Sequence, residues 1–475
     1  MRCAHYSAVA SVRLGASGIV STMSETRPPE RLLSPAYAAV TIGMFSLIGF
    51  VAFEAMAVTT VMPTVARDLD GGDLFALSFA APLASGVIGM VAAGMWSDRR
   101  GPVAPLIWSM VLFSVGLLAC AAAPTMAILV GGRLVQGLGG GALIVGLYVL
   151  VGVVFPASLQ PAIFASFAAA WVLPSLFGPA LAALVADVVG WRWVFGGAVI
   201  FVAAAAVLIT PSLRGRRTDT EVKASGAGPL LWATMGATAV LALELLGSAR
   251  GLVGLGALGA FALVVLALRQ LLPAGSLTGA RGLPAVIATR GLMSAGFFCA
   301  EAFIVYVLQS QWGLTPGRAG LALSAVGISW AVASQVQARL GERISHVRAM
   351  EVGSLLLLVG VVVLALTVWL DGPALLAGAT YVIAGAGMGL GYPRTSVAML
   401  DASSDADRGS NSAALTIADS LGAALALSIS GVVFAVAERQ GANPFLAVFV
   451  FAIGLGVLGV VTAHRTAQPQ LVAVG

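Results

Sequence analysis

Residues 36–62 read AYAAVTIGMFSLIGFVAFEAMAVTTVM, an apolar stretch that contains one acidic residue, Glu54. A helix needs about 20 apolar residues to cross the hydrocarbon of a bilayer, and this stretch is long enough. A carboxylate at membrane depth is costly unless it is paired, protonated or in contact with water. Arg133 lies at a comparable depth in another long apolar segment. The combination indicates a buried acid that serves proton or ion coupling.

The composition extends this interpretation to the whole chain. Of its 475 residues, 59% are hydrophobic and only 9% are charged, and the mean hydropathy is +1.00. Soluble domains carry about 25% charged residues. We therefore predict an all-α polytopic membrane protein with the lipid bilayer as its surroundings. The net charge of +5 then reflects cytoplasmic loops, and we expect no nucleic-acid partner.

No residue pattern indicates metal, cofactor or enzyme chemistry. The cysteines and histidines are few and scattered: Cys3, Cys120, Cys299, His5, His346 and His464. They lack the spacing of a metal site or a disulfide framework. No phosphate-binding loop with lysine is present, which disfavours an ATP-driven pump. We expect no metal, no cofactor and no enzymatic activity.

Fourteen apolar segments are long enough to span a bilayer. Six come first, at residues 36–62, 74–95, 103–123, 126–152, 161–187 and 193–212. Two follow a charged linker, at 229–248 and 251–272, and six more lie at 285–308, 319–340, 348–370, 374–400, 411–437 and 444–463. The predicted parts are a cytoplasmic tail (1–35), a six-helix bundle (36–212), a linker with two extra helices (213–284), a second six-helix bundle (285–463) and a tail (464–475). Met23 begins a polar stretch, and we expect residues 1–22 to precede the true start.

Arginine placement predicts the orientation. With the N-terminus inside, most loop arginines lie in cytoplasmic segments, among them Arg99, Arg100, Arg214, Arg290 and Arg343. The outer loops hold fewer: Arg67, Arg192, Arg250, Arg318 and Arg439. This is the bias expected of cytoplasmic loops, and an even number of spans then puts both termini inside.

The segment between the second and third spans reads Gly94-Met-Trp-Ser-Asp98-Arg99-Arg100-Gly101. Glycine tolerates the positive φ that so short a turn needs. Asp98 can face the positive end of a neighbouring helix while the arginines face the cytoplasm. We interpret Gly94, Asp98, Arg99 and Gly101 as a charged latch that stabilises one conformation. The alternative is a solvated loop that only sets topology.

Two later spans contain residues that bend helices or allow close packing. Span four contains Arg133-Leu-Val-Gln136-Gly, followed by more glycines, and span five contains Pro174-Ser-Leu-Phe-Gly178-Pro179. An arginine inside a span usually has a function, whereas glycine and proline also serve packing alone. Packing without function is the alternative for span five.

These segments, in this order, resemble the signatures of the major facilitator superfamily. The loop signature departs from the family only where Pro102 and Val103 replace a basic pair, and the helix-five antiporter signature has alanines at two usual glycines. Fourteen spans resemble the drug:proton antiporter branch of that family. Its usual first-helix aspartate is absent, and Glu54 lies nearby instead. The resemblance implies a fold of two six-helix bundles and a proton-coupled exporter.

The two halves also show a weak internal repeat. The loop at Gly94 has an echo at Gly341-Glu342-Arg343, between corresponding spans of the second half. Glu54 and Glu301 occupy corresponding places in the helices that open the two halves. Parallel repeats of this kind place a transport site between the halves. We predict that the two carboxylates flank one central cavity.

Other membrane charges can be paired by depth. Glu54 and Arg133 lie at similar distances from the predicted outer ends of their spans, and we expect an ion pair. Arg394 and Asp419 match in the same way near the inner ends, and we interpret that pair as structural. Glu244 lies near an outer helix end, where its side chain can extend to water.

The leading hypothesis is a monomeric secondary transporter of the bacterial plasma membrane that exports amphipathic organic compounds or drugs in exchange for protons. Glu54, Arg133 and Glu301 would couple the proton. The alternatives are an exporter of a metabolite or lipid precursor in the same fold, and a membrane-embedded transferase, which lacks a visible catalytic motif. Helix position suggests a cavity lined by Met44, Phe45, Trp171, Phe298, Tyr306, Gln309 and Trp330, although core packing is the alternative for each aromatic residue.

Overall fold

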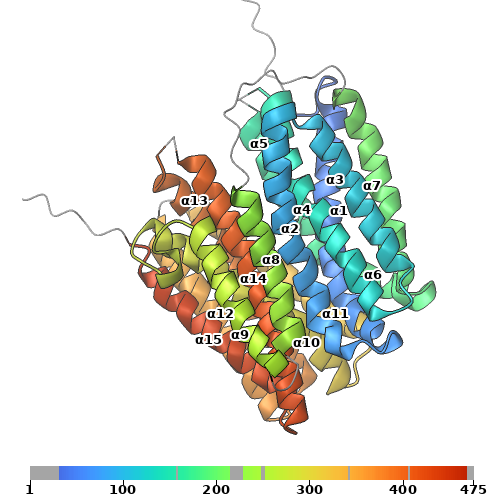
Figure 1. Cartoon of the computed structure of the whole chain (residues 1–475), viewed down its shortest axis with the longest axis vertical. Coiled ribbons are helices and arrows are strands. Elements are labelled where there is room, and N and C mark those ends of the chain that lie inside the picture. The colour runs from blue at the N-terminus through green and yellow to red at the C-terminus, as the bar shows by residue number, and fades with distance from the viewer. Residues whose placement is uncertain are drawn as a thin grey trace, which may run out of the picture.

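The computed structural model describes residues 32–156, 159–213, 228–247, 252–340, 343–404 and 407–467. Within these ranges the regular structure is helical, with no strand (Figure 1). Twelve of the described helices are long and apolar enough to cross a membrane. Many of the large apolar side chains that remain exposed, such as Leu118, Val207 and Val450, lie on such helices, as expected for a surface that faces lipid.

The first half consists of α1 (Ala38–Asp68), α2 (Phe75–Arg100), α3 (Val103–Ala121), α4 (Met126–Val154), α5 (Gln160–Ala170), α6 (Val172–Val188) and α7 (Arg192–Leu213). The second half consists of α10 (Leu283–Ser310), α11 (Pro316–Leu340), α12 (His346–Trp369), α13 (Ala374–Asp401), α14 (Arg408–Arg439) and α15 (Pro444–His464). Between them lie α8 (Gly228–Gly247) and α9 (Leu252–Leu271). The all-α prediction with two extra central helices is therefore confirmed.

The predicted fifth span, residues 161–187, consists of two consecutive helices. It is divided at Trp171 into α5 and α6. Pro174 explains the break, because a proline ring collides with the carbonyl of the residue four positions earlier, here Ala170, the last residue of α5. The sequence shows the proline but does not show that a helix ends just before it.

The two halves repeat one packing arrangement. α4 packs against α2 and α3, and α13 packs against α11 and α12. A side chain on Gly137 of α4 would collide with Pro82 of α2, and one on Gly385 of α13 would collide with Val326 of α11. Glycine allows these backbones to approach closely. The repeat therefore shows which residues of the two halves correspond.

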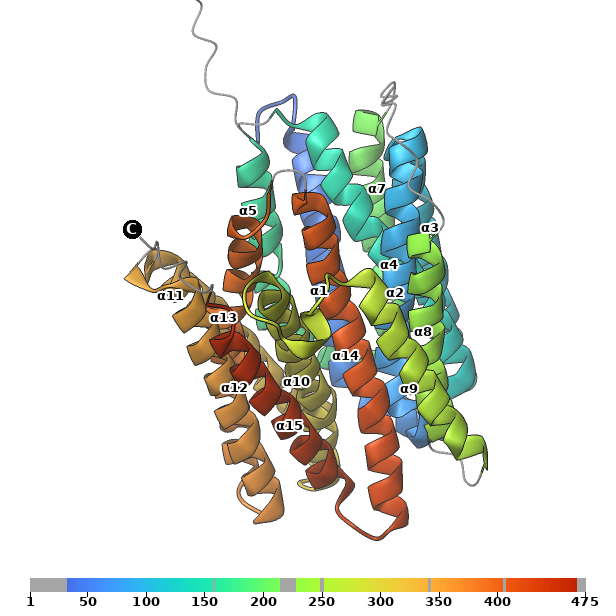
Figure 2. The same ribbon diagram turned by 60° about the vertical axis from the view of Figure 1, so that its left-hand side comes forward.

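The halves meet mainly through α2 with α14 and α6 with α11, and α1 also contacts α10 and α11. Figure 2 shows α14 running beside α2 along the seam between the halves. We use the term predicted outer end for the end of the bundle that carries residues 68–75, 310–316 and 439–444. There Arg67 donates to Gln309 across the seam (3.2 Å), and Phe75 packs on Tyr306.

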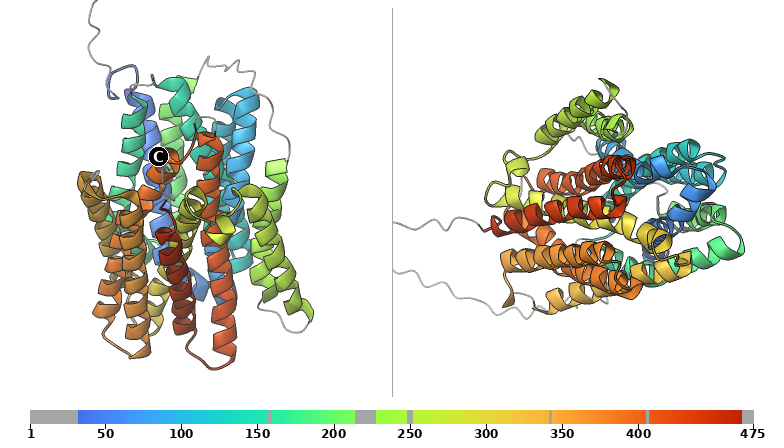
Figure 3. Two further views of the ribbon diagram at one scale, coloured as in Figure 1. Left: turned by 90° about the vertical axis from the view of Figure 1, so that its left-hand side faces the viewer. Right: turned by 90° about the horizontal axis from the view of Figure 1, so that it is seen from below.

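The two extra helices form a hairpin on the side of the bundle. α9 packs on α8, and α8 packs on both α2 and α14 (Figure 3). The short turn η2 (Ser276–Thr278) follows α9 and leads to α10. The hairpin therefore touches both halves at their seam.

Candidate functional site

Glu54 and Arg133 form the predicted ion pair. Arg133 Nη1 lies 2.5 Å from Glu54 Oε1, and the residues are only 5% and 7% exposed. Arg133 also donates to Gln136 Oε1 (2.7 Å) and, through Nε, to the backbone oxygen of Ser78 (3.1 Å). The pair thus joins α1, α2 and α4.

Arg133 has hydrogen-bond acceptors besides Glu54, and these determine whether its guanidinium stays satisfied when Glu54 is neutral. Removing one member of a buried ion pair usually leaves an uncompensated charge, which is strongly destabilising. Gln136 and the Ser78 carbonyl would still accept from Arg133 if Glu54 became neutral. The geometry is therefore compatible with Glu54 in either protonation state.

Local packing explains how the arginine reaches this depth. Gly132, next to Arg133, lies against Gly116 and Cys120 of α3. Gly137, one turn later, lies against Pro82 of α2. These glycines bring α4 into the angle between α2 and α3, and the guanidinium then extends to α1.

The second half places a different residue opposite its carboxylate. Gly385 corresponds to Gly137 in the repeat, so Tyr381, four residues earlier, corresponds to Arg133. The Tyr381 hydroxyl donates to the backbone oxygen of Phe297 (2.7 Å), one turn before Glu301. Glu301 is 5% exposed, and among the described residues it has neither an ion pair nor a hydrogen bond. The two carboxylates are equivalent in position but not in partner.

The predicted pair between Arg394 and Asp419 is wrong. Asp419 pairs with Arg290 instead, at 3.1 Å from its Nε. Arg394 donates to the side chain and the backbone oxygen of Gln337 and lies 3.4 Å from His346 Nδ1. Equal depth along two helices does not make two side chains face each other, because each side chain also leaves its helix in a particular direction.

Arg290 organises a polar cluster that sequence reasoning missed. Its guanidinium lies 3.3 Å from the ring centre of Tyr392 and donates to Thr395. Asp419 also accepts from the Tyr392 hydroxyl (2.8 Å) and from Ser294. The cluster joins α10, α13 and α14. The prediction that Arg290 lies in a cytoplasmic loop is wrong, because it lies inside α10, and the apolar residues on both sides of it are the signal for that position.

The latch is only partly described. α2 continues through the predicted loop to Arg100, so only Gly101 and Pro102 separate it from α3. Gly101 has a φ of +79°, as its predicted role requires. Gly94 lies inside α2, where an added Cβ atom would be in ordinary contact with Val145 at 4.0 Å, and Arg99 is exposed. The Asp98 side chain lies outside the described part of the structure, so the latch stays a prediction.

The antiporter segment lies where α6 meets both α1 and the other half. Gly178 packs against Phe53 and Met56 of α1, next to Glu54. Pro179 packs against Gly320 of α11 across the seam. Pro174 ends the preceding helix, as described above. The segment therefore connects the surroundings of the buried carboxylate to the contact between the halves.

The predicted cavity residues do not form one site in this conformation. Met44 is fully buried in the core, whereas Trp171 is 43% exposed at the break between α5 and α6. Phe298 and Trp330 both pack edge-on against Phe297, and Phe45 is half-buried against the core. Helix position alone could not separate core from cavity.

Tyr306 and Gln309 belong to the closure at the predicted outer end. Gln309 is buried and accepts from Arg67. Tyr306 lines a pocket of about 360 Å³ with Ala66, Arg67, Asp70 and Gly72. These two residues therefore block the seam in this conformation.

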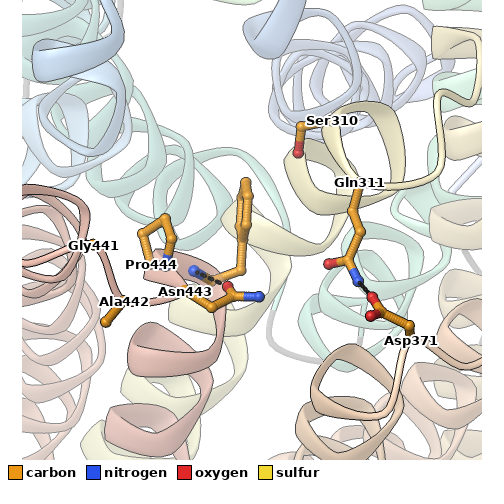
Figure 4. Close-up of a pocket in the computed structure, with 8 residues that line it drawn as sticks. Ser310, Gln311, Asp371, Gly441, Ala442, Asn443 and Pro444 are labelled. Carbon is orange, nitrogen blue, oxygen red and sulfur yellow. Dashed lines mark hydrogen bonds between the residues drawn. The ribbon is translucent and has the colours of Figure 1, made fainter.

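A second pocket of about 460 Å³ lies among the loops of the second half at the same end. Figure 4 shows its lining, in which Gln311 donates to Asp371 (2.6 Å) and Asn443 caps the start of α15. It contains none of the predicted site residues.

The fold and the buried charges define a membrane transporter rather than an enzyme. The family model described as Major Facilitator Superfamily matches residues 44–305, and the chain belongs to this family. It is 28% identical over 468 residues to a probable multidrug-efflux transporter of Mycobacterium tuberculosis, covering 94% of this chain and 98% of the relative. It is 24% identical over 442 residues to the multidrug efflux pump SdrM of Staphylococcus aureus, covering 89% and 96%.

Solved structures agree on the fold. The POT family transporter PepTSo superposes with a TM-score of 0.66 at 15% identity, covering 89% of this chain and 96% of that one. The xylose transporter XylE from E. coli superposes with a TM-score of 0.61 at 14% identity, with the same coverage. At this identity the likeness concerns the architecture alone.

Proposed function

We propose that this protein is a secondary transporter that exports amphipathic organic compounds or drugs across a bacterial plasma membrane in exchange for protons, and that it works as a monomer. The observation that carries the proposal is the buried Glu54–Arg133 pair, in which the arginine keeps other acceptors if the acid becomes neutral. Two relatives that match this chain along nearly their whole length are named as multidrug exporters, which supports the proposed substrate class.

In the proposed cycle, Glu54 takes up a proton from outside when the transporter is open outward. Neutral Glu54 holds Arg133 less strongly, which favours return to the inward-open state. Substrate then enters from the cytoplasm and displaces the proton to that side.

The contacts across the seam support a conformation closed at the predicted outer end. Arg67 with Gln309, Phe75 with Tyr306 and Pro179 with Gly320 all join the halves there. Export requires these contacts to break, since rocking of the halves opens one side at a time. Glu301 is a second candidate for proton binding in the same cycle.

Transport into proteoliposomes tests the proposal. Vesicles that contain the protein and an imposed pH gradient should accumulate amphipathic dyes, and a protonophore should abolish accumulation. A compound screen in an efflux-deficient host should show resistance with the same sensitivity to the protonophore. Dye transport that ignores the protonophore would contradict proton exchange, and transport of a metabolite or lipid precursor alone would favour the other exporter hypothesis.

A further inference from the structure

Glu244 of the linking hairpin is a buried carboxylate that the proposed cycle does not use. It is 5% exposed, and both of its carboxyl oxygens lack accessible surface and a hydrogen-bond partner among the described residues. The expectation that this side chain extends to water is wrong. The helix lies at the seam, and the side chain points into the seam.

The carboxyl group occupies a space between α2 and α14. A Cβ atom on Gly431 of α14 would lie 2.7 Å from Glu244 Oε1 and 2.8 Å from the Cβ of Ala76 on α2. Gly431 therefore leaves the room that the carboxyl group fills. The Ser428 hydroxyl and the backbone of Leu77 lie close to the carboxyl group, and Ser428 Oγ itself has no hydrogen-bond partner among the described residues.

No cation compensates this carboxylate among the described residues. Glu244 is the only charged residue of α8, and the charges of α2 are at the opposite end, at Asp98, Arg99 and Arg100. On α14, Asp419 is paired with Arg290, and Arg408, Glu438 and Arg439 lie at the helix ends. On the other elements nearby, α9 has Arg269 in its last turn and η1 (Gly72–Leu74) has Asp73. Glu244 forms an ion pair with none of the side chains that the structure describes. An ionised carboxylate left alone at this depth costs several kcal/mol, whereas the neutral acid does not carry that cost.

We propose that Glu244 binds a proton in this conformation and releases it when α2 and α14 separate at the predicted outer end. The linking hairpin then carries a proton site of its own, apart from Glu54. The inference rests on the proposed function only in that transport opens the contact between α2 and α14.

The sign of the pH dependence follows from linkage. The closed conformation holds one more proton at Glu244 than the open one, in which water reaches the carboxylate. The closed conformation is therefore favoured at low pH, and its population falls as the pH rises. For one linked proton, the closed-to-open ratio falls about tenfold per pH unit between the pH at which the water-exposed carboxyl group titrates in the open state and the higher pH at which the buried one titrates in the closed state.

Distance measurement between spin labels tests this. Labels on Gly72→Cys and Ala442→Cys, both exposed at the predicted outer end on opposite sides of the seam, report opening directly. Cys120 and Cys299 are buried, and Cys3 is replaced by serine. The experiment uses the Glu54→Gln/Glu301→Gln background, so that proton binding at Glu54 and Glu301 does not contribute to the slope.

In that background the closed-to-open ratio should fall with pH as stated, and adding Glu244→Gln should remove the dependence and keep the outer end closed. An unchanged slope in Glu244→Gln overturns the proposal. Infrared difference spectra should also lose a carbonyl band of a protonated carboxylic acid in Glu244→Gln. If this variant does not fold, Gly431→Ala replaces it, because its methyl group enters the space of the carboxyl group. Gly431→Ala should shift the pH midpoint of the opening transition, and an unshifted pH midpoint overturns the proposal as well.

Loss of uphill export in Glu54→Gln bears on the proposed function, not on Glu244. The proton site on the hairpin can therefore fail while Glu54 coupling stands, or stand while Glu54 coupling fails.

Discussion

Tyr381 occupies in α13 the position that Arg133 occupies in α4. Each lies four residues before a glycine that packs on the second helix of its own half, Gly385 and Gly137. Arg133 pairs with Glu54, whereas the Tyr381 hydroxyl donates to a backbone oxygen one turn before Glu301. The repeat has therefore kept two carboxylates and, within the part of the chain that the structure describes, given only one of them a cation.

The first prediction concerns the paired carboxylate. Glu54→Gln imitates the protonated acid and cannot release a proton, so the variant should still bind dye and exchange it across the membrane. Uphill accumulation driven by a pH gradient should be lost. Dye accumulation in proteoliposomes measures this, and Glu301→Gln measured in parallel shows whether the second carboxylate is also needed for uphill transport. Uphill export at the wild-type level in Glu54→Gln would move the coupling site to Glu301.

Arg133 gives the second prediction. Arg133→Ala removes the cation beside Glu54, which favours the neutral acid, so activity should shift toward alkaline pH or vanish. Breaking a buried pair in this way also costs ~3–5 kcal/mol. The pH profile of dye transport separates the two effects, because a folding defect lowers the amount of protein without moving the optimum. A profile with an unchanged optimum would argue against any influence of Arg133 on Glu54.

The sequence supported the class of fold and one of the two ion pairs, for a physical reason. The length of the apolar segments and the placement of the arginines are local features of the sequence, so they can be recognised without knowing which helices touch. Glu54 and Arg133 were matched by depth, and their helices also happen to be neighbours. For Arg394 and Asp419 the same argument failed, because depth does not fix the direction of a side chain.

Burial was the other property that the sequence could not supply. Glu244 near a helix end was expected to reach water, yet α2 and α14 cover it. Met44 was expected in a cavity and lies in the core. Both errors come from contacts between distant segments, which one helical pattern does not contain.

A third prediction concerns the latch. Asp98→Asn keeps the size of the side chain and removes its charge. If the latch stabilises one conformation, transport should fall by about tenfold or more while expression is retained, because exchange between conformations is disturbed. Dye efflux from cells with matched protein levels measures the effect, and Arg100→Gln serves as the control on the same helix end. Near-normal efflux in Asp98→Asn would return this segment to a topological role.

A fourth prediction concerns orientation. The arginine bias places Gly72 outside and Ser225 inside, the latter in a segment outside the described residues. A membrane-impermeant thiol reagent applied to intact cells should label Gly72→Cys and should label Ser225→Cys only after lysis. Labelling of Ser225→Cys in intact cells would overturn the predicted orientation and the assignment of the closed end as outer.

The last prediction concerns the pair that the structure revealed. Arg290 and Asp419 share one hydrogen-bonded cluster with Tyr392, so their substitutions should not be additive. In a double-mutant cycle on thermal stability, Arg290→Gln and Asp419→Asn should each destabilise, and the double variant should be less unstable than their sum. Residues in one such network couple by about 0.5–3 kcal/mol. The matched control is the cycle of Arg394→Gln with Asp419→Asn, which should be additive within about 0.5 kcal/mol, because those two side chains form no bond. Additivity in the first cycle together with coupling in the second would restore the pairing by depth and remove Arg290 from the cluster.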